Sequence, residues 1–178
     1  MRIVAGIYKN KNIVAPSGEH TRPTSDKTRE SIFNIIAPYI VDSNVLDIFS
    51  GSGALGLEAL SRGAKKVTLI DNDINAINCI KENINNLKAN DKVKVIQDDY
   101  KVIKSLNEKF DVILFDPPYK LEVFDEIFNL IKEHSLLNEY GVIVYESNKE
   151  NSLTGEYDGF KLKVYKYGIA FVNVLFKL

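Results

Sequence analysis

The sequence predicts an α/β fold built on a mostly parallel β-sheet. From residue 44 onward, short apolar strand-like runs alternate with runs of helical period, which is the pattern of right-handed βαβ crossovers. Residues 160–178, FKLKVYKYGIAFVNVLFKL, break this alternation, because two extended halves follow each other with no helix between them. Tyr167-Gly168 can turn the second half back onto the first. We therefore expect a sheet flanked by helices that ends in an antiparallel hairpin.

The composition is that of one globular domain with a small extension. The chain has 178 residues, of which 45% are hydrophobic and 26% charged, and its formal net charge is -1. No apolar run approaches the ~18 residues of a membrane span, and the first residues, MRIVAGIYKNKN, lack the apolar core of a secretory signal. The single cysteine, Cys79, excludes an internal disulfide. We expect a cytoplasmic protein with no membrane contact. No metal is expected, since His20 and His134 lack ligand spacing.

Basic residues gather near both ends of the chain, and residues 160–178 contain no acidic residue. The lysines and arginines of these two regions are Arg2, Lys9, Lys11, Arg22, Lys27, Arg29, Lys161, Lys163, Lys166 and Lys177. A basic rim can attract phosphate locally, although an ordinary solvated surface has the same composition. Charge alone therefore does not decide whether the partner is a nucleic acid.

The N-terminal residues 1–22 are expected to form a hairpin extension of a main domain that covers residues 23–178. Residues 2–15 have the composition of two short strands around Lys9-Asn10-Lys11-Asn12. Asparagine tolerates the left-handed backbone of a tight turn, which favours a hairpin here.

The main domain is predicted to begin with a helix capped by Thr24, Ser25 or Asp26. Alternating strands and helices follow it. The expected strands cover residues 44–49, 66–71, 92–97, 112–115 and 141–147, and the expected helices cover residues 26–39, 54–63, 73–89, 100–107 and 122–136.

The first of three candidate sites is DIFSGSGALG, residues 47–56, where a predicted strand meets a helix. Ligands of open α/β sheets bind beyond the carboxyl ends of the strands. Gly51 and Gly53 allow a tight turn and a close backbone approach to a ligand, and Gly56 allows close packing of the helix on the sheet. The helix N-terminus also offers free N–H groups and a positive dipole end. A glycine-rich turn without a ligand is the alternative interpretation.

The second candidate site follows the next two strands. Asp71 lies 20 residues after Gly51, where a carboxylate can accept both hydroxyls of a ribose. Asp98 and Asp99 follow the third strand, where they can meet an adenine amino group or can instead cap the next helix. These sites indicate an adenine nucleoside with a tail, and they leave a dinucleotide and S-adenosylmethionine both open.

The third candidate site is VILFDPPY, residues 112–119. Two prolines stop a buried strand immediately after the carboxylate of Asp116. Asp116 and the carbonyl group of Pro117 offer hydrogen-bond acceptors, and Tyr119 offers a flat face for stacking. This combination suits a planar ring with an exocyclic amino group. The alternative is that Asp116 caps the following helix and Tyr119 packs on it.

These motifs together resemble those of the bacterial 16S ribosomal RNA guanine-N2 methyltransferases, a family of class I S-adenosylmethionine-dependent enzymes. The family pattern begins with RI(I/V)-x-G, which reads here as Arg2-Ile3-Val4-Ala5-Gly6. RPTSDKTRESIFN at residues 22–34 and GSGALGLEALSRGA at residues 51–64 match the next two blocks. The DPPY motif is also found in DNA amino methyltransferases. Two positions depart from the usual pattern, namely Asn12, where a positive charge is common, and Asp71, where glutamate is common.

The resemblance implies a sheet order of 3-2-1-4-5-7-6 with the seventh strand antiparallel. It implies S-adenosylmethionine as cofactor, held by Asp47, Ser50, Gly51, Gly53, Asp71, Asn72, Asp99 and Tyr100, with Arg22 and Thr24 closing over the cofactor or the RNA backbone. The target guanine would be held by Asp116, Pro117, Pro118 and Tyr119. The implied substrate is a guanine (guanine 966 type) of 16S rRNA, in the small ribosomal subunit or an assembly intermediate, and the implied enzyme is a monomer.

Three other functions are compatible with parts of this pattern. A nicotinamide-dependent oxidoreductase shares the glycine motif and Asp71 but does not account for DPPY or the terminal hairpin. A DNA adenine or cytosine amino methyltransferase has both motifs but usually needs an added recognition region. A non-catalytic RNA-binding module leaves the acidic site residues without a purpose.

Overall fold

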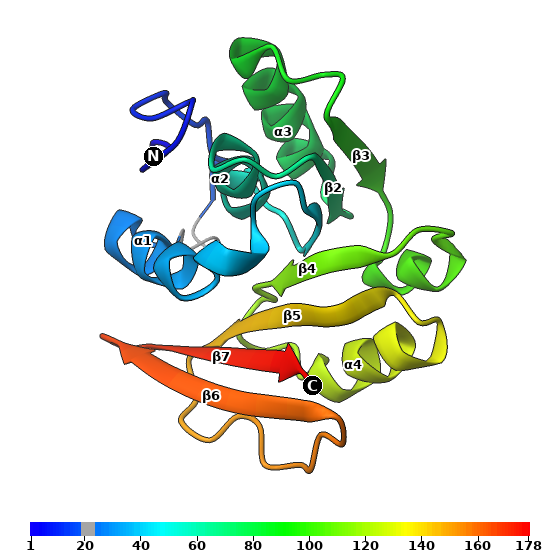
Figure 1. Ribbon diagram of the computed structural model, residues 1–178. Helices are drawn as coiled ribbons and strands as arrows, with labels where there is room; N and C mark the ends of the chain where they lie inside the picture. The colour runs from blue at the N-terminus through cyan, green and yellow to red at the C-terminus, as the bar shows by residue number, and fades with distance from the viewer. Residues whose placement is uncertain (19–23) are drawn as a thin grey trace.

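A computed structural model describes residues 1–18 and 24–178 of the chain. The seven strands form a single sheet in the order β3-β2-β1-β4-β5-β7-β6 (Figure 1). The strands are β1 (Asn44–Ile48), β2 (Lys66–Asp71), β3 (Val93–Gln97), β4 (Phe110–Phe115), β5 (Leu137–Ser147), β6 (Phe160–Tyr167) and β7 (Ala170–Lys177). The helices are α1 (Asp26–Ile35), α2 (Ala54–Ser61), α3 (Ile74–Leu87) and α4 (Phe124–Glu133), with 3-10 turns η1 (Ala37–Tyr39) and η2 (Tyr100–Ser105). None of the helices in the described ranges has the length and apolarity to cross a bilayer.

The pairing of the strands confirms both the parallel sheet and its antiparallel end. Strands β3, β2, β1, β4 and β5 run parallel to one another, as expected for strands joined by crossover helices. Strand β7 pairs antiparallel with β5 and with β6, and the turn between β6 and β7 contains Gly168, whose φ is 62°. The carboxyl ends of β1, β2, β4 and β5 therefore lie at one edge of the sheet.

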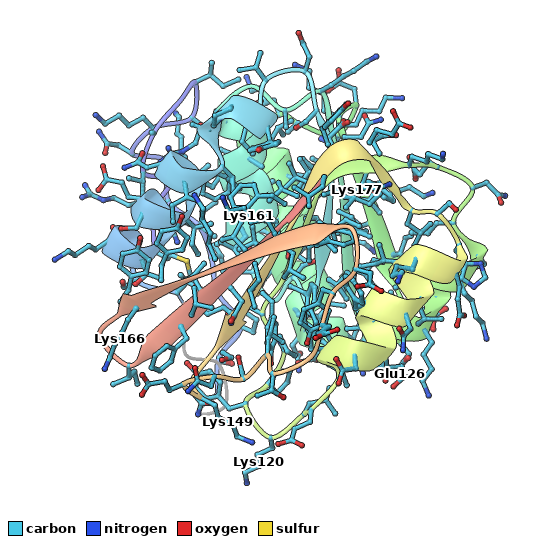
Figure 2. The ribbon with its side chains drawn as sticks, turned by 60° about the horizontal axis from the view of Figure 1, so that its bottom comes forward. Lys120, Glu126, Lys149, Lys161, Lys166 and Lys177 are labelled. Carbon is cyan, nitrogen blue, oxygen red and sulfur yellow. The ribbon has the colours of Figure 1, made fainter. Side chains whose placement is uncertain are left out.

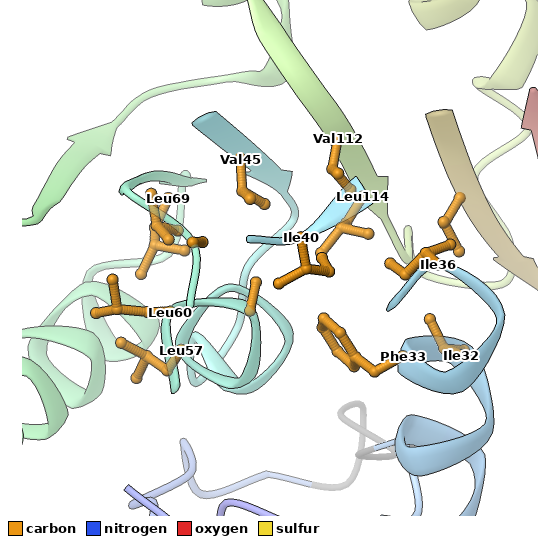
Figure 3. Packing of buried hydrophobic residues seen from close by; sticks show 14 of the residues in the cluster. Ile32, Phe33, Ile36, Ile40, Val45, Leu57, Leu60, Leu69, Val112 and Leu114 are labelled. Atoms are coloured by element: carbon orange, nitrogen blue, oxygen red, sulfur yellow. The ribbon is translucent and has the colours of Figure 1, made fainter. Parts of the chain in front are cut away.

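Two hydrophobic clusters cover the two faces of the sheet. On the first face, Phe33 and Ile36 from the α1 region and Leu57 from α2 pack towards Val45 and Leu114 of the central strands (Figure 3). On the second face, residues of α4 and η2 pack against alternate residues of the same strands, including Leu46, Ile48, Ile113 and Phe115. Because successive side chains of a strand point to opposite faces, the central strands β1, β4 and β5 bury apolar side chains on both sides.

The predicted element boundaries agree with the observed ones to within two residues except in four places, which are the end of α1, the end of α4, the start of β5 at Leu137 instead of residue 141, and the N-terminal hairpin. The helix expected over residues 26–39 ends at Ile35, because Pro38 cannot donate a helical hydrogen bond and lies in the separate turn η1. The segments expected at 100–107 and 122–136 are the shorter elements η2, which is a 3-10 turn, and α4.

The N-terminal hairpin is the fourth difference. The two strands expected within residues 2–15 are reduced to one antiparallel bridge, between Arg2 and Asn12. The turn itself is confirmed, since Asn10 has a φ of 67° and its N–H donates to the carbonyl of Ile3. Much of the backbone bonding of this segment instead goes to side chains of α2 and α3, which explains why no extended ladder forms.

Candidate active site at the carboxyl ends of the strands

The glycine-rich segment after β1 forms a tight turn that leads into α2. Phe49, Gly51 and Gly53 have φ values of 60°, 56° and 80°, so three residues of the turn adopt left-handed backbone. Of these three residues, Phe49 carries the conformational strain, since a bulky residue rarely adopts left-handed backbone. Ser50 fixes the turn, because its hydroxyl donates to the carbonyls of Asp47 and Ile70 at 2.7 and 3.0 Å.

Gly56 brings α2 onto the sheet and places a hydrogen-bond donor beside Asp47. A Cβ at Gly56 would lie 2.3 Å from Leu69 Cδ2, so only glycine fits this contact. The backbone N–H of Gly56 donates to Asp47 Oδ2 at 3.0 Å. The other oxygen, Asp47 Oδ1, has no hydrogen-bond partner within the described residues, although the residue is only 1% exposed. Burial raises the pKa of Asp47 to about 7.

Asp71 ties the glycine-rich turn to the end of β2. Its two carboxylate oxygens accept from the backbone N–H groups of Gly51 at 2.8 Å and Asp73 at 2.9 Å. Each oxygen retains a further lone pair, since a carboxylate has about four acceptor positions. Asn72 is exposed beside it. The carboxylate is thus held by two backbone groups at the end of β2, and its contact with a ribose stays a prediction.

The residues after β3 have structural roles in the fold. Asp99 caps η2 by accepting from the N–H of Lys101 at 2.9 Å, as the capping alternative anticipated. The ring of Tyr100 lies 5.5 Å from that of Phe49, and its hydroxyl donates to Glu126 at 2.7 Å. Desolvation, followed by this carboxylate, raises the pKa of Tyr100 to about 12. The contact of Asp99 with an adenine therefore stays a prediction.

Asp116 follows β4, half-buried, beside two other carboxyl groups. Its Oδ2 lies 3.4 Å from the hydroxyl of Thr24, which also lies 3.0 Å from Glu146 Oε2. Burial raises the pKa of Asp116 well above its ordinary range, and the nearby charges of Glu146 and Asp47 raise it further. The alternative in which Asp116 caps α4 is not realised, because α4 begins eight residues later at Phe124 and its N-cap residue is Val123.

A pocket of about 200 Å³ opens beside the DPPY turn. The carbonyl of Pro118 accepts from the N–H of Leu121 at 2.8 Å, which closes a turn whose residues line the pocket. Tyr119 is 38% exposed at this mouth. The lining combines apolar and aromatic side chains with polar groups, and its residues are Pro117, Pro118, Tyr119, Leu121, Glu122, Phe124, Asp125, Tyr145, Glu146, Ser147, Asn148, Lys149, Ser152 and Leu153.

The comparison with known proteins decides the family of this chain. The family model described as Conserved hypothetical protein 95 matches residues 1–175. The chain belongs to this family. The chain is 40% identical over 157 residues to the putative rRNA methyltransferase YlbH of Bacillus subtilis, covering 86% of this chain and 85% of the relative. It is 36% identical over 157 residues to the ribosomal RNA small subunit methyltransferase D of Haemophilus influenzae, covering 86% and 81%.

Solved structures agree with this assignment. A putative methyltransferase of Escherichia coli, yhhF, has a TM-score of 0.89 and 32% identity, and the match covers 99% of this chain and 97% of that one. The family indicated by the sequence motifs and the predicted strand order are therefore confirmed. The class I methyltransferase fold of this family uses S-adenosylmethionine as its cofactor.

The candidate site has acceptor groups and open space that fit S-adenosylmethionine. Asp47 Oδ1 is a buried acceptor without a partner among the residues that the structure describes, which suits an ammonium group. A Cβ on Gly51 would meet no atom within 4 Å, so space for a ligand lies against that backbone. Asp71 presents a carboxylate to the same edge. Ser50, Asn72 and Tyr100 flank these groups, and within residues 1–18 and 24–178 none of them has a comparable buried atom without a partner. Their cofactor contacts stay predictions.

Glu146 is a site residue that the sequence analysis missed. It is 6% exposed near the end of β5 and is bonded to Thr24, so the structure brings Thr24, Asp116 and Glu146 together. The sequence does contain a signal for it, which is an acidic residue inside the apolar strand GVIVYES. A charge buried in such a strand needs a partner or a function, so Glu146 could have been named as a candidate. Arg22, the other residue predicted to close over the site, lies outside the described residues.

Lysines line the rim of this candidate site. Figure 2 shows Lys120, Lys149 and Lys166 projecting outward along one rim of the molecule. Lys149 pairs with Glu122, and Lys166 lies 5.5 Å from the centre of the Phe171 ring at the start of β7. Lys161 and Lys177 lie at the opposite end of the β6–β7 pair (Figure 2). The lysines of the basic C-terminal segment are thus divided between the two ends of the β6–β7 pair.

Proposed function

We propose that this protein transfers a methyl group from S-adenosylmethionine to the exocyclic N2 amine of a specific guanine in 16S rRNA of the small ribosomal subunit. The observation that carries the proposal is the juxtaposition of three features at one edge of the sheet. These are the Asp47 oxygen that has no partner among the described residues, the carboxyl group of Asp116 directly after the neighbouring strand β4, and the pocket beside Pro117 and Tyr119. The relatives named as rRNA methyltransferases support RNA as the substrate class.

The residues of the DPPY turn would hold the reacting amine. S-adenosylmethionine supplies an electrophilic methyl group on a sulfonium. The lone pair of a guanine amine is delocalised into the ring and is a weak nucleophile. Asp116 and the carbonyl of Pro117 would accept its two N–H groups and turn the lone pair towards the methyl. Aligning two reactants in this way can supply ~7–11 kcal/mol of the barrier.

Little acid–base catalysis is required of Asp116 in this mechanism. The methylated, ammonium-like product is itself very acidic and can lose its proton to water. The role of Asp116 is therefore to bind and orient the amine, and its hydrogen bonds are expected to strengthen as positive charge develops on nitrogen.

Tyr119 and the lysine rim would hold the RNA. An exposed aromatic ring at the mouth of a pocket suits stacking with a base that has left its helix. Lys120, Lys149 and Lys166 would contact phosphates, which fix the register of the RNA without reading its sequence. We propose that the enzyme acts in the cytoplasm, as a monomer, on the small subunit or one of its assembly intermediates.

Methylation of unmodified small subunits with labelled S-adenosylmethionine tests the proposal, and mapping the label identifies the base. Free 16S rRNA and duplex DNA are the parallel substrates. We expect label on N2 of one guanine of 16S rRNA and none on DNA. Label on adenine or cytosine of the duplex would instead support a DNA amino methyltransferase. Binding of NAD in place of S-adenosylmethionine in a thermal-shift comparison would support an oxidoreductase.

A further inference from the structure

Tyr145 lies in the wall of the pocket beside the DPPY turn, in a position that its neighbours fix. It is 8% exposed near the carboxyl end of β5, where it pairs in register with Phe115 of β4 and Asn173 of β7. The centre of its ring lies 5.1 Å from that of Phe115 and 5.0 Å from that of Phe124. Because both of these rings are buried, the phenol is held in one orientation by close packing.

The hydroxyl of Tyr145 has no hydrogen-bond partner within residues 1–18 and 24–178. The neighbouring Tyr157 packs on the same Phe124 ring and does have an acceptor, since its hydroxyl lies 3.4 Å from Asp125. A buried tyrosine hydroxyl usually finds a partner. A buried O–H group that lacks one in the wall of a pocket indicates a ligand with a hydrogen-bond acceptor.

The groups around the phenol keep its proton in place. Burial first, and then the negative charges of Asp116, Glu122 and Asp125, raise the pKa of Tyr145. Because Glu122 and Asp125 also line the pocket, the hydroxyl end of the ring lies on the pocket side. A phenol in this environment is a hydrogen-bond donor throughout the neutral pH range.

The protons of the other polar side chains in this part of the wall are already used within the protein. The hydroxyls of Ser147 and Ser152 bond each other at 2.9 Å, and that of Ser147 also bonds the carbonyl of Lys149 at 3.0 Å. The ammonium group of Lys149 pairs with Glu122. Ionised carboxylates can only accept. Tyr145 is therefore the buried donor that the pocket wall still has available in the part of the chain that the structure describes.

The proposed substrate has an acceptor next to its reacting amine. In guanine the amine is attached to C2, and the ring nitrogen N3 beside it carries a lone pair and no hydrogen. The ring nitrogen on the other side, N1, carries a hydrogen and does not suit a donor. Asp116 and the carbonyl of Pro117 would hold the amine, and Tyr145 lies close enough to Asp116 to be affected by its charge.

We propose that the hydroxyl of Tyr145 donates a hydrogen bond to N3 of the target guanine, which makes Tyr145 a specificity-determining residue of the base pocket. The inference rests on the proposed function, which places the guanine amine at Asp116 and its ring on Tyr119. Stacking on Tyr119 leaves the base free to rotate in its own plane about the amine. The bond from Tyr145 removes this freedom and keeps the amine lone pair in line with the methyl group.

Tyr145→Phe tests the inference, because it removes the hydroxyl and keeps the ring contacts with Phe115 and Phe124. The variant should unfold in urea at the wild-type midpoint, since the hydroxyl bonds no described residue. Its kcat/KM for small subunits should fall about 5- to 150-fold, the factor for leaving one buried polar group unpaired. Its affinity for S-adenosylhomocysteine, measured by calorimetry, should equal that of the wild type, because the hydroxyl faces the base.

Tyr140→Phe is the matched control. It removes the same group from the same strand, at a position that is 74% exposed towards the other end of β5. Its kcat/KM should equal that of the wild type. An effect confined to position 145 therefore reports on the pocket and not on the loss of a phenol hydroxyl from β5.

The substrate provides an independent arm of the experiment. Small subunits reconstituted with 16S rRNA that carries 3-deazaguanosine at the methylated position keep the amine but lack the N3 acceptor. The wild type should lose the same factor of about 5 to 150 on these subunits. Tyr145→Phe should lose almost nothing further, because the two changes delete the two partners of one hydrogen bond.

A Tyr145→Phe enzyme as fast as the wild type would overturn the inference. Undiminished wild-type activity on 3-deazaguanosine would do the same, as would two losses that multiply. An affinity for S-adenosylhomocysteine that falls as much as kcat/KM would place the hydroxyl at the cofactor and so also contradict the inference. In each of these cases the proposed function stands while the wild type still labels N2 of one guanine. If the wild type labels no guanine, the proposed function fails and this inference fails with it.

Discussion

The hydroxyl of Thr24 donates to Glu146 Oε2 at 3.0 Å, across 122 residues of sequence. This contact attaches the segment before α1 to the carboxyl end of β5, directly beside Asp116. A residue that lies before the first strand in sequence thus becomes part of the site at the centre of the sheet. The geometry of the acceptors at the DPPY turn therefore depends on the docking of the N-terminal region.

Replacing Asp116 with alanine is expected to lower turnover at least about 10-fold, because a charge-assisted hydrogen bond contributes about 1.5–3 kcal/mol. Affinity for S-adenosylhomocysteine should be unchanged, since Asp116 holds the amine and not the thioether. Single-turnover methylation of small subunits measures the first quantity and calorimetry the second. A variant that methylates as fast as wild type would remove Asp116 from the reaction.

Tyr119→Ala is expected to weaken binding of the RNA substrate by about 1–3 kcal/mol, the range for stacking of one base on an aromatic ring. Tyr119→Phe keeps the ring and should have a small effect. The measurement is the dissociation constant for RNA together with KM. A severe loss in the phenylalanine variant would show that the hydroxyl, and not the ring, contacts the substrate.

Asp47 should make the ligand-free protein less stable as the pH rises. The raised pKa, about 7 against an ordinary 3.8, means that the folded state favours the protonated acid. Its contribution to stability is therefore complete below about pH 4 and is lost as the pH rises through about 7. Asp47→Asn should remove this dependence and be more stable than wild type at about pH 8, by a few kcal/mol in order of magnitude.

Urea unfolding of both proteins at about pH 5 and about pH 8 without cofactor measures this effect. Addition of S-adenosylmethionine should stabilise the wild type more than the variant, because the variant lacks the carboxylate that would pair with the ammonium group. Equal pH dependence in the two proteins would contradict the assignment of Asp47 as the titrating group.

The sequence predicts those residues of the candidate site that depend on local chemistry. Gly51, Gly53 and Asp71 follow from a glycine-rich turn between a strand and a helix, and Asp116 follows from a strand stopped by prolines. Glu146 could not be recognised in the same way, because its role depends on Thr24, which reaches it through tertiary packing. The N-terminal strands were predicted from composition, yet backbone groups of this segment find partners on α2 and α3, so only one bridge forms.

Gly56→Ala is expected to destabilise the fold by about 1–3 kcal/mol, the usual cost of forcing a methyl group into a packed core. The new Cβ would lie 2.3 Å from Leu69 Cδ2 and 2.9 Å from Val67 Cγ1, so α2 or the side chains of β2 must shift. The double variant Gly56→Ala/Leu69→Ala should lose less stability than the sum of the two single losses, because the shorter side chain at position 69 leaves room for the new methyl group. Urea unfolding of the wild type, both single variants and the double variant measures this coupling. Strict additivity of the two substitutions would show that Leu69 is not the obstacle.

Glu58 should determine whether the N-terminal segment stays docked. It is fully buried on α2, and its two oxygens accept from the backbone N–H groups of Val4 at 2.9 Å and Ala5 at 3.0 Å. It also pairs with Arg62 at 2.9 Å and with the buried Arg29 at 3.5 Å. Glu58→Gln removes the carboxylate that faces Arg29 at 3.5 Å, but Arg29 keeps its ion pair with Asp26 at 2.8 Å, so we expect a loss of about 1–3 kcal/mol from the weakened hydrogen bonds.

Urea unfolding should show this loss, and hydrogen exchange should show faster opening of residues 2–14 than of the sheet. The exposed Glu82 on α3 provides the control, since Glu82→Gln should change stability by no more than about 0.5 kcal/mol. Because Thr24 follows this segment and bonds Glu146, Glu58→Gln should also lower methyl transfer beyond what the fraction of folded protein explains. Unchanged exchange at residues 2–14 would mean that the apolar contacts of Ile3 and Ile13, and not Glu58, hold the segment in place.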